Sequence, residues 1–171
     1  ILSAALKKEK LDVAGYQRMI ATTTQLNTPG PELAALPGVH AITDVTGFGL
    51  AGHALEMARG ARCTVQLDWA RVPLLDGVRD LASAGYVTGA SGRNWAAYGH
   101  EVQLPPNFPA VDQALLSDPQ TSGGLLVSCA PEAVDEVVAV FRRHGFAGAV
   151  DVGGVQALQA GAAPGLQVRE R

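Results

Sequence analysis

Residues 39–60, VHAITDVTGFGLAGHALEMARG, contain the patterns of a strand, a glycine-rich turn and a helix in direct succession. The apolar run over 39–45 predicts a short strand that delivers Asp44 at its end. From Leu50 to Arg59 the apolar residues recur at helical spacing, and Gly60 stands where a glycine commonly ends a helix. A strand that turns directly into a helix is typical of a layered domain with both element types.

The rest of the chain continues this alternation of strands and helices. Further helices are predicted over 13–26, 74–84, 111–116 and 131–144, and further strands over 62–67, 125–129, 149–152 and 166–169. A charged connector is predicted over 1–10, and an irregular loop, functional or mobile, over 86–109. We therefore expect an α+β fold (α/β layered), with a mixed β-sheet flanked by helices.

Composition excludes several classes of protein. The 171 residues carry 13 Lys and Arg against 16 Asp and Glu, a net charge of −3, and 47% are hydrophobic. This balance excludes a disordered chain and a nucleic-acid binder that depends on excess positive charge. No uncharged run is apolar enough to span a membrane. Cys63 and Cys129 lie far apart in strand patterns without zinc spacing, so we expect buried thiols and a reducing, cytoplasmic setting.

Asp44 and the glycines that follow it form a candidate metal and phosphate site. Gly47 and Gly49 leave backbone N–H groups free at a helix N-terminus, which favours a bound anion. Magnesium is usually held by one or two carboxylates together with substrate phosphates. We therefore predict that Asp44 is a Mg²⁺ ligand and that Thr46, Gly47 and Gly49 shape the phosphate side of the turn.

Two other interpretations of this stretch stay open. The residues could form only a helix cap, with glycines for close packing. The glycines at 47, 49 and 52 also have the spacing of a dinucleotide-binding turn, with Asp68 as its acidic partner. A phosphate loop of the GxxxxGK[ST] type is excluded because its lysine is missing.

Two further polar stretches are candidates for the same pocket, SDPQTSGG over 117–124 and GRNWAAYGH over 92–100. The polar residues that we add to the predicted nucleotide and phosphate pocket are Arg93, Asn94, Gln120, Thr121 and Ser122. Alternatively, the first stretch is only a turn capped by an Asp side chain, and Trp95 and Tyr98 of the second are packing anchors. The four histidines show no metal-ligand spacing.

The stretches DVTGFGLAGH, RNWAAYGH and DPQTSGGLL, in this order, resemble the C-terminal half of selenophosphate synthetase (selenide, water dikinase). The resemblance runs from the first residues to near Arg171. It implies a fold like the C-terminal domain of aminoimidazole ribonucleotide synthetase. It also divides the chain into a connector and leading helix over 1–30 and a synthetase-like domain over 31–171, with the N-terminal ATP-binding and dimerisation domain absent from this chain.

The resemblance implies a reaction in which ATP, selenide and water give selenophosphate, AMP and phosphate, with Mg²⁺ as cofactor. It also implies a cytoplasmic homodimer that acts on small molecules, with no nucleic-acid or membrane partner. The family's catalytic Cys or selenocysteine and its nearby Lys belong to a segment near the family's N-terminus. Nothing here matches them, and the only lysines lie within residues 7–10. We therefore expect no catalytic residue in this chain and no turnover by it alone, with Asp44 matching a family Mg²⁺ ligand.

Two alternatives to this function remain open at the level of sequence. The chain could be a non-catalytic binding or regulatory module of the same superfamily. It could also belong to a sister ATP-dependent enzyme, whose members release ADP and not AMP.

Overall fold

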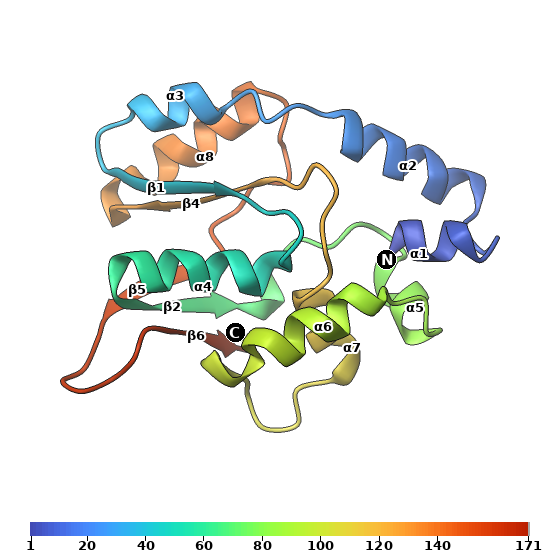
Figure 1. Cartoon of the computed structure of the whole chain (residues 1–171). Coiled ribbons are helices and arrows are strands. Elements are labelled where there is room, and N and C mark those ends of the chain that lie inside the picture. Colours follow the sequence, from blue (N-terminus) through green and yellow to red (C-terminus); the bar gives the residue numbers. More distant parts are fainter. Residues whose placement is uncertain (171) are drawn as a thin grey trace.

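The computed structural model describes residues 1–170, which form two β-sheets with helices between and around them (Figure 1). The smaller sheet pairs β1 (Val39–Asp44) antiparallel with β4 (Leu125–Cys129). The larger sheet has the strand order β3-β6-β2-β5. Its strands are β2 (Cys63–Asp68), β3 (Val102–Gln103), β5 (Gly153–Ala157) and β6 (Gly165–Arg169). β6 runs parallel to β2 and β3 whereas β5 runs antiparallel to β2, so the predicted α+β class with a mixed sheet is confirmed.

The helices divide into those that pack on the sheets and those gathered at one end. In chain order they are α1 (Leu2–Lys7), α2 (Val13–Thr24), α3 (Gly30–Ala35), α4 (Gly49–Ala61), α5 (Val78–Ser83), α6 (Gly89–Tyr98), α7 (Ala110–Leu116) and α8 (Val134–Arg143), with 3-10 turns at Trp69–Arg71, Gly99–Glu101 and Pro131–Ala133. Figure 1 shows α3 and α8 over the β1–β4 pair, α4 between the two sheets, and α1, α2 and α5 at one end. α4 contacts β1, β2 and β6, so it joins the two sheets.

The main core lies where α4 meets the larger sheet. Ala51, Ala54 and Leu55 of α4 are buried in one hydrophobic cluster with Leu67 of β2 and Leu166 of β6. The small alanines let the helix approach the strands closely. Complete burial of a leucine such as Leu55 contributes about 1.5–3 kcal/mol to stability.

A second cluster lies under α3 and α8. Val137, Val140 and Phe141 of α8 follow helical spacing and pack with Leu33 of α3 against the β1–β4 pair. This second layer holds the pair in place, and the loops at the end of β1 and before β4 are positioned by it.

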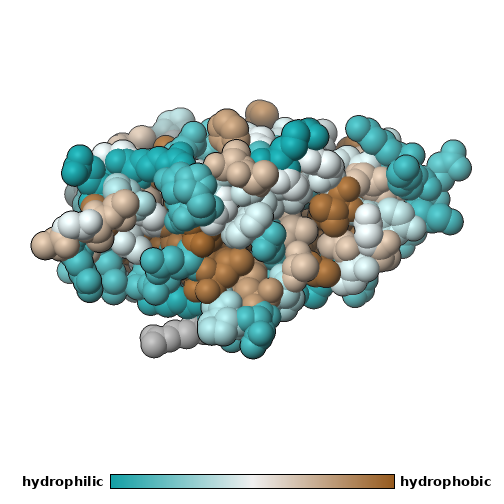
Figure 2. All heavy atoms as spheres, turned by 60° about the horizontal axis from the view of Figure 1, so that its bottom comes forward, coloured by the Kyte–Doolittle hydropathy of each residue, from teal (hydrophilic) through white to brown (hydrophobic). Residues whose placement is uncertain are grey.

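Apolar side chains also reach the surface. Figure 2 shows them as brown patches interrupted by hydrophilic surface. The large hydrophobic residues with the greatest exposed fractions are Val13 (74%), Leu26 (75%), Phe48 (54%) and Val155 (52%). Within residues 1–170, no helix has the length and apolar character needed to cross a membrane.

The prediction of an irregular loop over 86–109 is wrong, because most of this stretch forms helix α6, a 3-10 turn and strand β3. Thr88 caps α6 by accepting a hydrogen bond from the Ser91 N–H at 3.2 Å. Ser91 and Tyr98 are buried, and Trp95 packs against the main core. The three residues recur at helical spacing, so they lie on one face of α6. The glycines within this stretch suggest a loop, but tertiary packing overrides their low helix propensity.

Three other sequence expectations also need correction. The α4 helix continues past Gly60, and Arg62 adopts the left-handed conformation that ends it, with φ of 52°. The strand predicted over 149–152 lies instead at β5, because pairing with β2 sets Val155 opposite Val65. Residues 2–7 of the predicted connector form the helix α1, whose Leu2 is buried in the main core.

Candidate functional site

Two loops meet at one end of the β1–β4 pair. The glycine turn, residues 45–49, follows β1, and the polar loop, residues 117–124, precedes β4. Because the two strands are antiparallel, both loops lie at the same end of the sheet. The Val45 N–H extends the strand pairing by donating to the Gly124 carbonyl at 2.9 Å.

Two glycines allow these loops to touch through their backbones. Gly49 has φ of +69°, and a Cβ there would lie 2.7 Å from the Ser117 carbonyl carbon. A Cβ on Gly123 would lie within 2 Å of the Val45 carbonyl oxygen. Any side chain at either position would push the loops apart, so Gly49, which is predicted to shape the phosphate side of the turn, also serves close packing.

Thr46 at the centre of the glycine turn is held from two directions. Its carbonyl accepts from the Gln120 N–H at 2.9 Å, and its own N–H donates to His53 Nε2 at 3.0 Å. A backbone N–H can only donate, so Nε2 is the unprotonated ring nitrogen and the proton resides on Nδ1. Nδ1 lies 2.9 Å from Glu56 Oε2 but at an angle that makes no hydrogen bond. The buried imidazole of His53 is therefore a fixed support for the turn.

Helix α6 supplies a second support. Asn94 Nδ2 donates to the Gly47 carbonyl at 2.9 Å and to the Ser117 carbonyl at 3.1 Å, and so bridges the two loops. The Tyr98 hydroxyl donates to the Phe48 carbonyl at 2.6 Å. Burial raises the pKa of Tyr98 to about 12, so this donor keeps its proton at neutral pH. Side chains from α4 and α6 thus hold the backbone of the glycine turn.

Asp44 contrasts with this well-bonded turn. Its side chain is exposed, and within residues 1–170 its carboxylate has no hydrogen bond or ion pair. The α4 N-terminus beside it begins after Phe48 without a side-chain cap, which leaves a positive dipole end for an anion. A free carboxylate next to an anion site is what Mg²⁺ carrying a phosphate requires. Among the described residues no cluster of three His, Cys, Asp or Glu could hold a metal by itself, and Asp44 offers a single carboxylate.

The structure brings most of the sequence-predicted residues together, but not all. Those at the junction of the two loops are Asp44, Thr46, Gly47, Gly49, Asn94 and Gln120. Thr121 and Ser122 are exposed at the tip of the polar loop, and Ser122 has φ of 49°. Arg93 is exposed on α6, and its guanidinium lies back along its own helix near Gly89.

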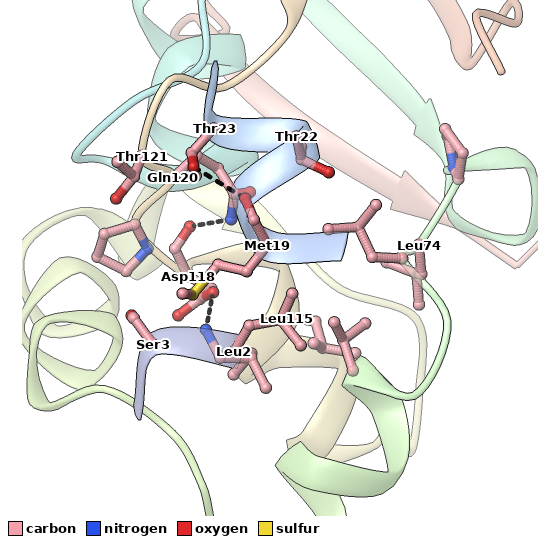
Figure 3. Close-up of a pocket in the computed structure, with 15 residues that line it drawn as sticks. Leu2, Ser3, Met19, Thr22, Thr23, Leu74, Leu115, Asp118, Gln120 and Thr121 are labelled. Atoms are coloured by element: carbon pink, nitrogen blue, oxygen red, sulfur yellow. Dashed lines mark hydrogen bonds and ion pairs between the residues drawn. The ribbon is translucent and has the colours of Figure 1, made fainter. Parts of the chain in front are cut away.

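A cavity of about 380 Å³ lies beside the polar loop, between α1, α2 and the start of α5 (Figure 3). Gln120 and Thr121 line it, whereas Asp44 and the glycine turn do not. At its base the buried Asp118 carboxylate accepts from the Ile1 nitrogen at 2.8 Å. The candidate site is therefore an open surface at the loop junction, with this cavity on one flank.

Sequence reasoning missed the supporting roles of His53 and Tyr98. The sequence suggests that His53 belongs to a helix face and Tyr98 to a packing anchor, and both are indeed buried. Their polar atoms reach the glycine turn only because α4 and α6 lie against it. The helical spacing of Asn94 and Tyr98, four residues apart, is the signal that could have indicated a shared face.

The two cysteines take no part in this site. Cys63 is buried in β2 and Cys129 half-buried in β4, and neither forms a disulfide. Burial raises the pKa of both thiols, so they stay protonated and poorly nucleophilic at neutral pH. This agrees with the expectation of structural thiols.

Over most of its length the chain is similar to proteins named selenide, water dikinase. It is 65% identical over 153 residues to "Selenide, water dikinase" of Burkholderia pseudomallei, an alignment that covers 90% of this chain and 43% of that protein. It is 58% identical over 157 residues to the protein of the same name from Pseudomonas straminea, covering 92% of this chain and 44% of that one. The chain thus spans less than half the length of these relatives.

A solved structure of hydrogenase maturation protein HypE has the same fold. It matches with a TM-score of 0.55 and 19% identity, covering 82% of this chain and 37% of that one. A second structure, of HypE in complex with ATP, matches with a TM-score of 0.54 and 18% identity. Residues 4–163 match the family described as "AIR synthase related protein, C-terminal domain". Because this match covers nearly the whole chain and the fold agrees with it, the chain belongs to that family.

Proposed function

We propose that this chain is the C-terminal half of an ATP-dependent selenophosphate synthetase. The full-length enzyme would convert ATP, selenide and water into selenophosphate, AMP and phosphate. The observation that carries the proposal is 65% identity over 153 residues to a selenide, water dikinase. Because the chain spans under half of such relatives, the activity belongs to the full-length protein.

In this function Asp44 contributes one carboxylate oxygen to a Mg²⁺ site shared with the other half of the enzyme. When bound, Mg²⁺ neutralises charge on the phosphates during cleavage of the two anhydride bonds of ATP. The carboxylate suits this role because it is exposed and unpartnered within residues 1–170. No group within residues 1–170 has to release it before a metal binds.

The glycine turn contributes a rigid anion site. Backbone N–H groups at the uncapped start of α4 face the phosphate side, with Thr46, Gly47 and Gly49 shaping the backbone. His53 and Asn94 fix this backbone before a ligand arrives, which lowers the ordering cost of binding. Gln120, Thr121 and Ser122 of the polar loop and Arg93 of α6 lie on the rim, where polar side chains can contact ATP or selenide.

The remaining partners follow from the same proposal. The full-length protein would supply the N-terminal domain with the reactive Cys or selenocysteine and Lys, and would form a homodimer. We place it in the cytoplasm, because a reducing compartment keeps Cys63 and Cys129 as free thiols. No nucleic-acid or membrane partner is part of the proposal.

The test is an assay of the full-length protein for selenide-dependent AMP formation, with wild type compared to Asp44→Asn. We expect wild type to form AMP only with selenide. The variant should lose at least about 100-fold in rate, equivalent to about 3 kcal/mol of transition-state stabilisation. Its thermal unfolding should match wild type, since the Asp44 side chain makes no contact that the fold needs.

Three results would contradict the proposal or a part of it. Release of ADP in place of AMP would indicate a sister enzyme, and no ATP consumption would indicate a binding module. Wild-type turnover by Asp44→Asn would leave the reaction intact and remove Asp44 from the metal site.

A further inference from the structure

Helix α2 exposes an apolar stripe that nothing in the described chain covers. Of its twelve residues only Gly15 is buried. Val13 (74% exposed), Tyr16 (46%) and Ile20 (41%) lie at positions i, i+3 and i+7 and so share one side of the helix, and Leu26 (75%) follows its end. We call these four residues the α2 stripe. Surface helices of soluble domains normally carry charged residues on their outer side, and exposed stripes like this one mark interaction sites.

The stripe is also nearly free of charge. Between Val13 and Leu26 the only ionisable side chain besides Tyr16 is Arg18. Its guanidinium lies 3.4 Å from the Asp76 carboxylate and donates to the Asp76 carbonyl at 3.2 Å. The charge of Arg18 is therefore paired within the domain. A partner that binds the stripe needs no charged residue opposite it.

Other positions of α2, next to the stripe and behind it, are attached to the domain, so the helix presents the stripe in a fixed direction. Asp12 caps the helix by accepting from the Gly15 N–H at 2.6 Å. Met19 packs against the main core, and Thr22 and Thr23 line the cavity beside α1. Figure 1 shows α2 at the outer edge of the molecule, away from the sheets.

The position of Ile1 indicates which partner can reach the stripe. The family is that of a C-terminal domain, and more than half of each relative's length lies outside the matched region. In the proposed full-length polypeptide, the preceding domain would connect to this one through Ile1. Ile1 is buried beside α2, where it lines the same cavity as Met19 and Thr22. A domain tethered there has a high effective concentration at the stripe.

We propose that the α2 stripe is the surface on which the preceding domain of the full-length polypeptide docks, through an apolar and uncharged face of that domain. The inference goes beyond the proposed reaction, since docking is measured without turnover. Loss of dikinase activity alone does not affect it.

Hydroxyl-radical footprinting of the full-length protein tests this directly, because oxidation reports the solvent access of each side chain. Tyr98 is an internal standard for a buried tyrosine at 7% exposure. If the stripe is uncovered, Tyr16 is oxidised about sixfold faster than Tyr98, the ratio of 46% to 7%. We expect Tyr16 to be oxidised as slowly as Tyr98. The sixfold ratio in the full-length protein would overturn the proposal.

A substitution pair gives the second arm. Val13→Arg with Ile20→Arg places two charges in the stripe, while Val155→Arg places one at a similarly exposed site on β5, at the other side of the molecule (Figure 1). The double variant should raise Tyr16 oxidation toward the sixfold ratio, and Val155→Arg should not. Far-ultraviolet circular dichroism shows whether each variant is folded. If a variant does not fold, the ratio of Tyr16 to Tyr98 oxidation in the wild-type protein still tests the proposal. Tyr16 protection that disappears on dilution would instead assign the stripe to a second copy and refute docking of the preceding domain.

Discussion

Replacement of Gly49 by alanine should destabilise the domain far more than the same change at Gly47, two residues earlier. Gly49 has φ of +69° and would place a Cβ 2.7 Å from the Ser117 carbonyl carbon, whereas a Cβ on Gly47 meets nothing within 4 Å. A left-handed backbone costs alanine about 1–2 kcal/mol. Forcing a methyl group into packed backbone costs about 1–3 kcal/mol more. The sum is about 2–5 kcal/mol for Gly49→Ala, against a change within about 1 kcal/mol for Gly47→Ala.

Thermal and urea unfolding of the two variants and wild type measure this difference. For a domain of this size each kcal/mol shifts the midpoint by about 2–4 °C, so Gly49→Ala should melt about 4–20 °C below wild type. Gly47→Ala should stay within a few degrees of it. Equal midpoints for the two variants would refute the argument that backbone contact between the two loops requires a glycine at 49. If both variants unfold at the same lowered midpoint, the loss of stability would come from the reduced flexibility of the glycine turn and not from the close approach of the two loops.

Three further predictions concern Asn94 and Tyr98, which hold the glycine turn, and the activity of the chain by itself. Asn94→Ala removes two hydrogen bonds to the carbonyls of Gly47 and Ser117, and should lower the free energy of unfolding by about 1–3 kcal/mol, measured by urea titration; a wild-type midpoint would contradict the bridging role. Burial raises the pKa of Tyr98 from 10.0 to about 12, so the unfolded chain loses its phenol proton first. The stability contributed by the neutral phenol is complete below pH 10 and declines as pH rises toward 12. Tyr98→Phe should flatten this alkaline decline in unfolding experiments at graded pH, and an unchanged slope would show that Tyr98 does not titrate late. The 171-residue chain alone should form no AMP from ATP and selenide, and measurable turnover would place the catalytic groups within it.

The parts of the fold that sequence predicted well are those set by local pattern. The strand over 125–129 and helix α8, which follows a 3-10 turn at Pro131–Ala133, have sequence patterns that agree with their tertiary surroundings. The failures occur where a distant partner decides. β5 lies at 153–157 because β2 pairs with it there, and no local feature marks that register. Helix α6 forms over two glycines because its buried face packs against the main core.

The candidate site shows the same division. Asp44 and the glycine turn could be predicted because a strand end, glycines and a helix start are adjacent in the sequence. The polar loop could be named as a candidate, but its contact with the glycine turn depends on β1 and β4 being neighbours. His53 acts on the turn through a local hydrogen bond from the helix that follows it, whereas Asn94 acts through a hydrogen bond across the fold. The Asn94 contact cannot be inferred from spacing along the chain.

The groups of the candidate site differ in whether they already have hydrogen-bond partners. This difference explains why the domain can hold part of a binding site in place while other parts of that site must come from elsewhere. The carbonyls of Thr46, Gly47 and Phe48 all accept hydrogen bonds from residues distant in the chain, so the backbone of the glycine turn has little freedom left to lose on binding. Asp44, one step away, has no partner within residues 1–170 and remains open to solvent. A metal bound here by one carboxylate would be weakly held, because Mg²⁺ needs several oxygen ligands in near-ideal geometry. For the proposed metal and phosphate role, this rigid turn and its single free carboxylate would therefore need a second surface that supplies the remaining ligands and excludes water.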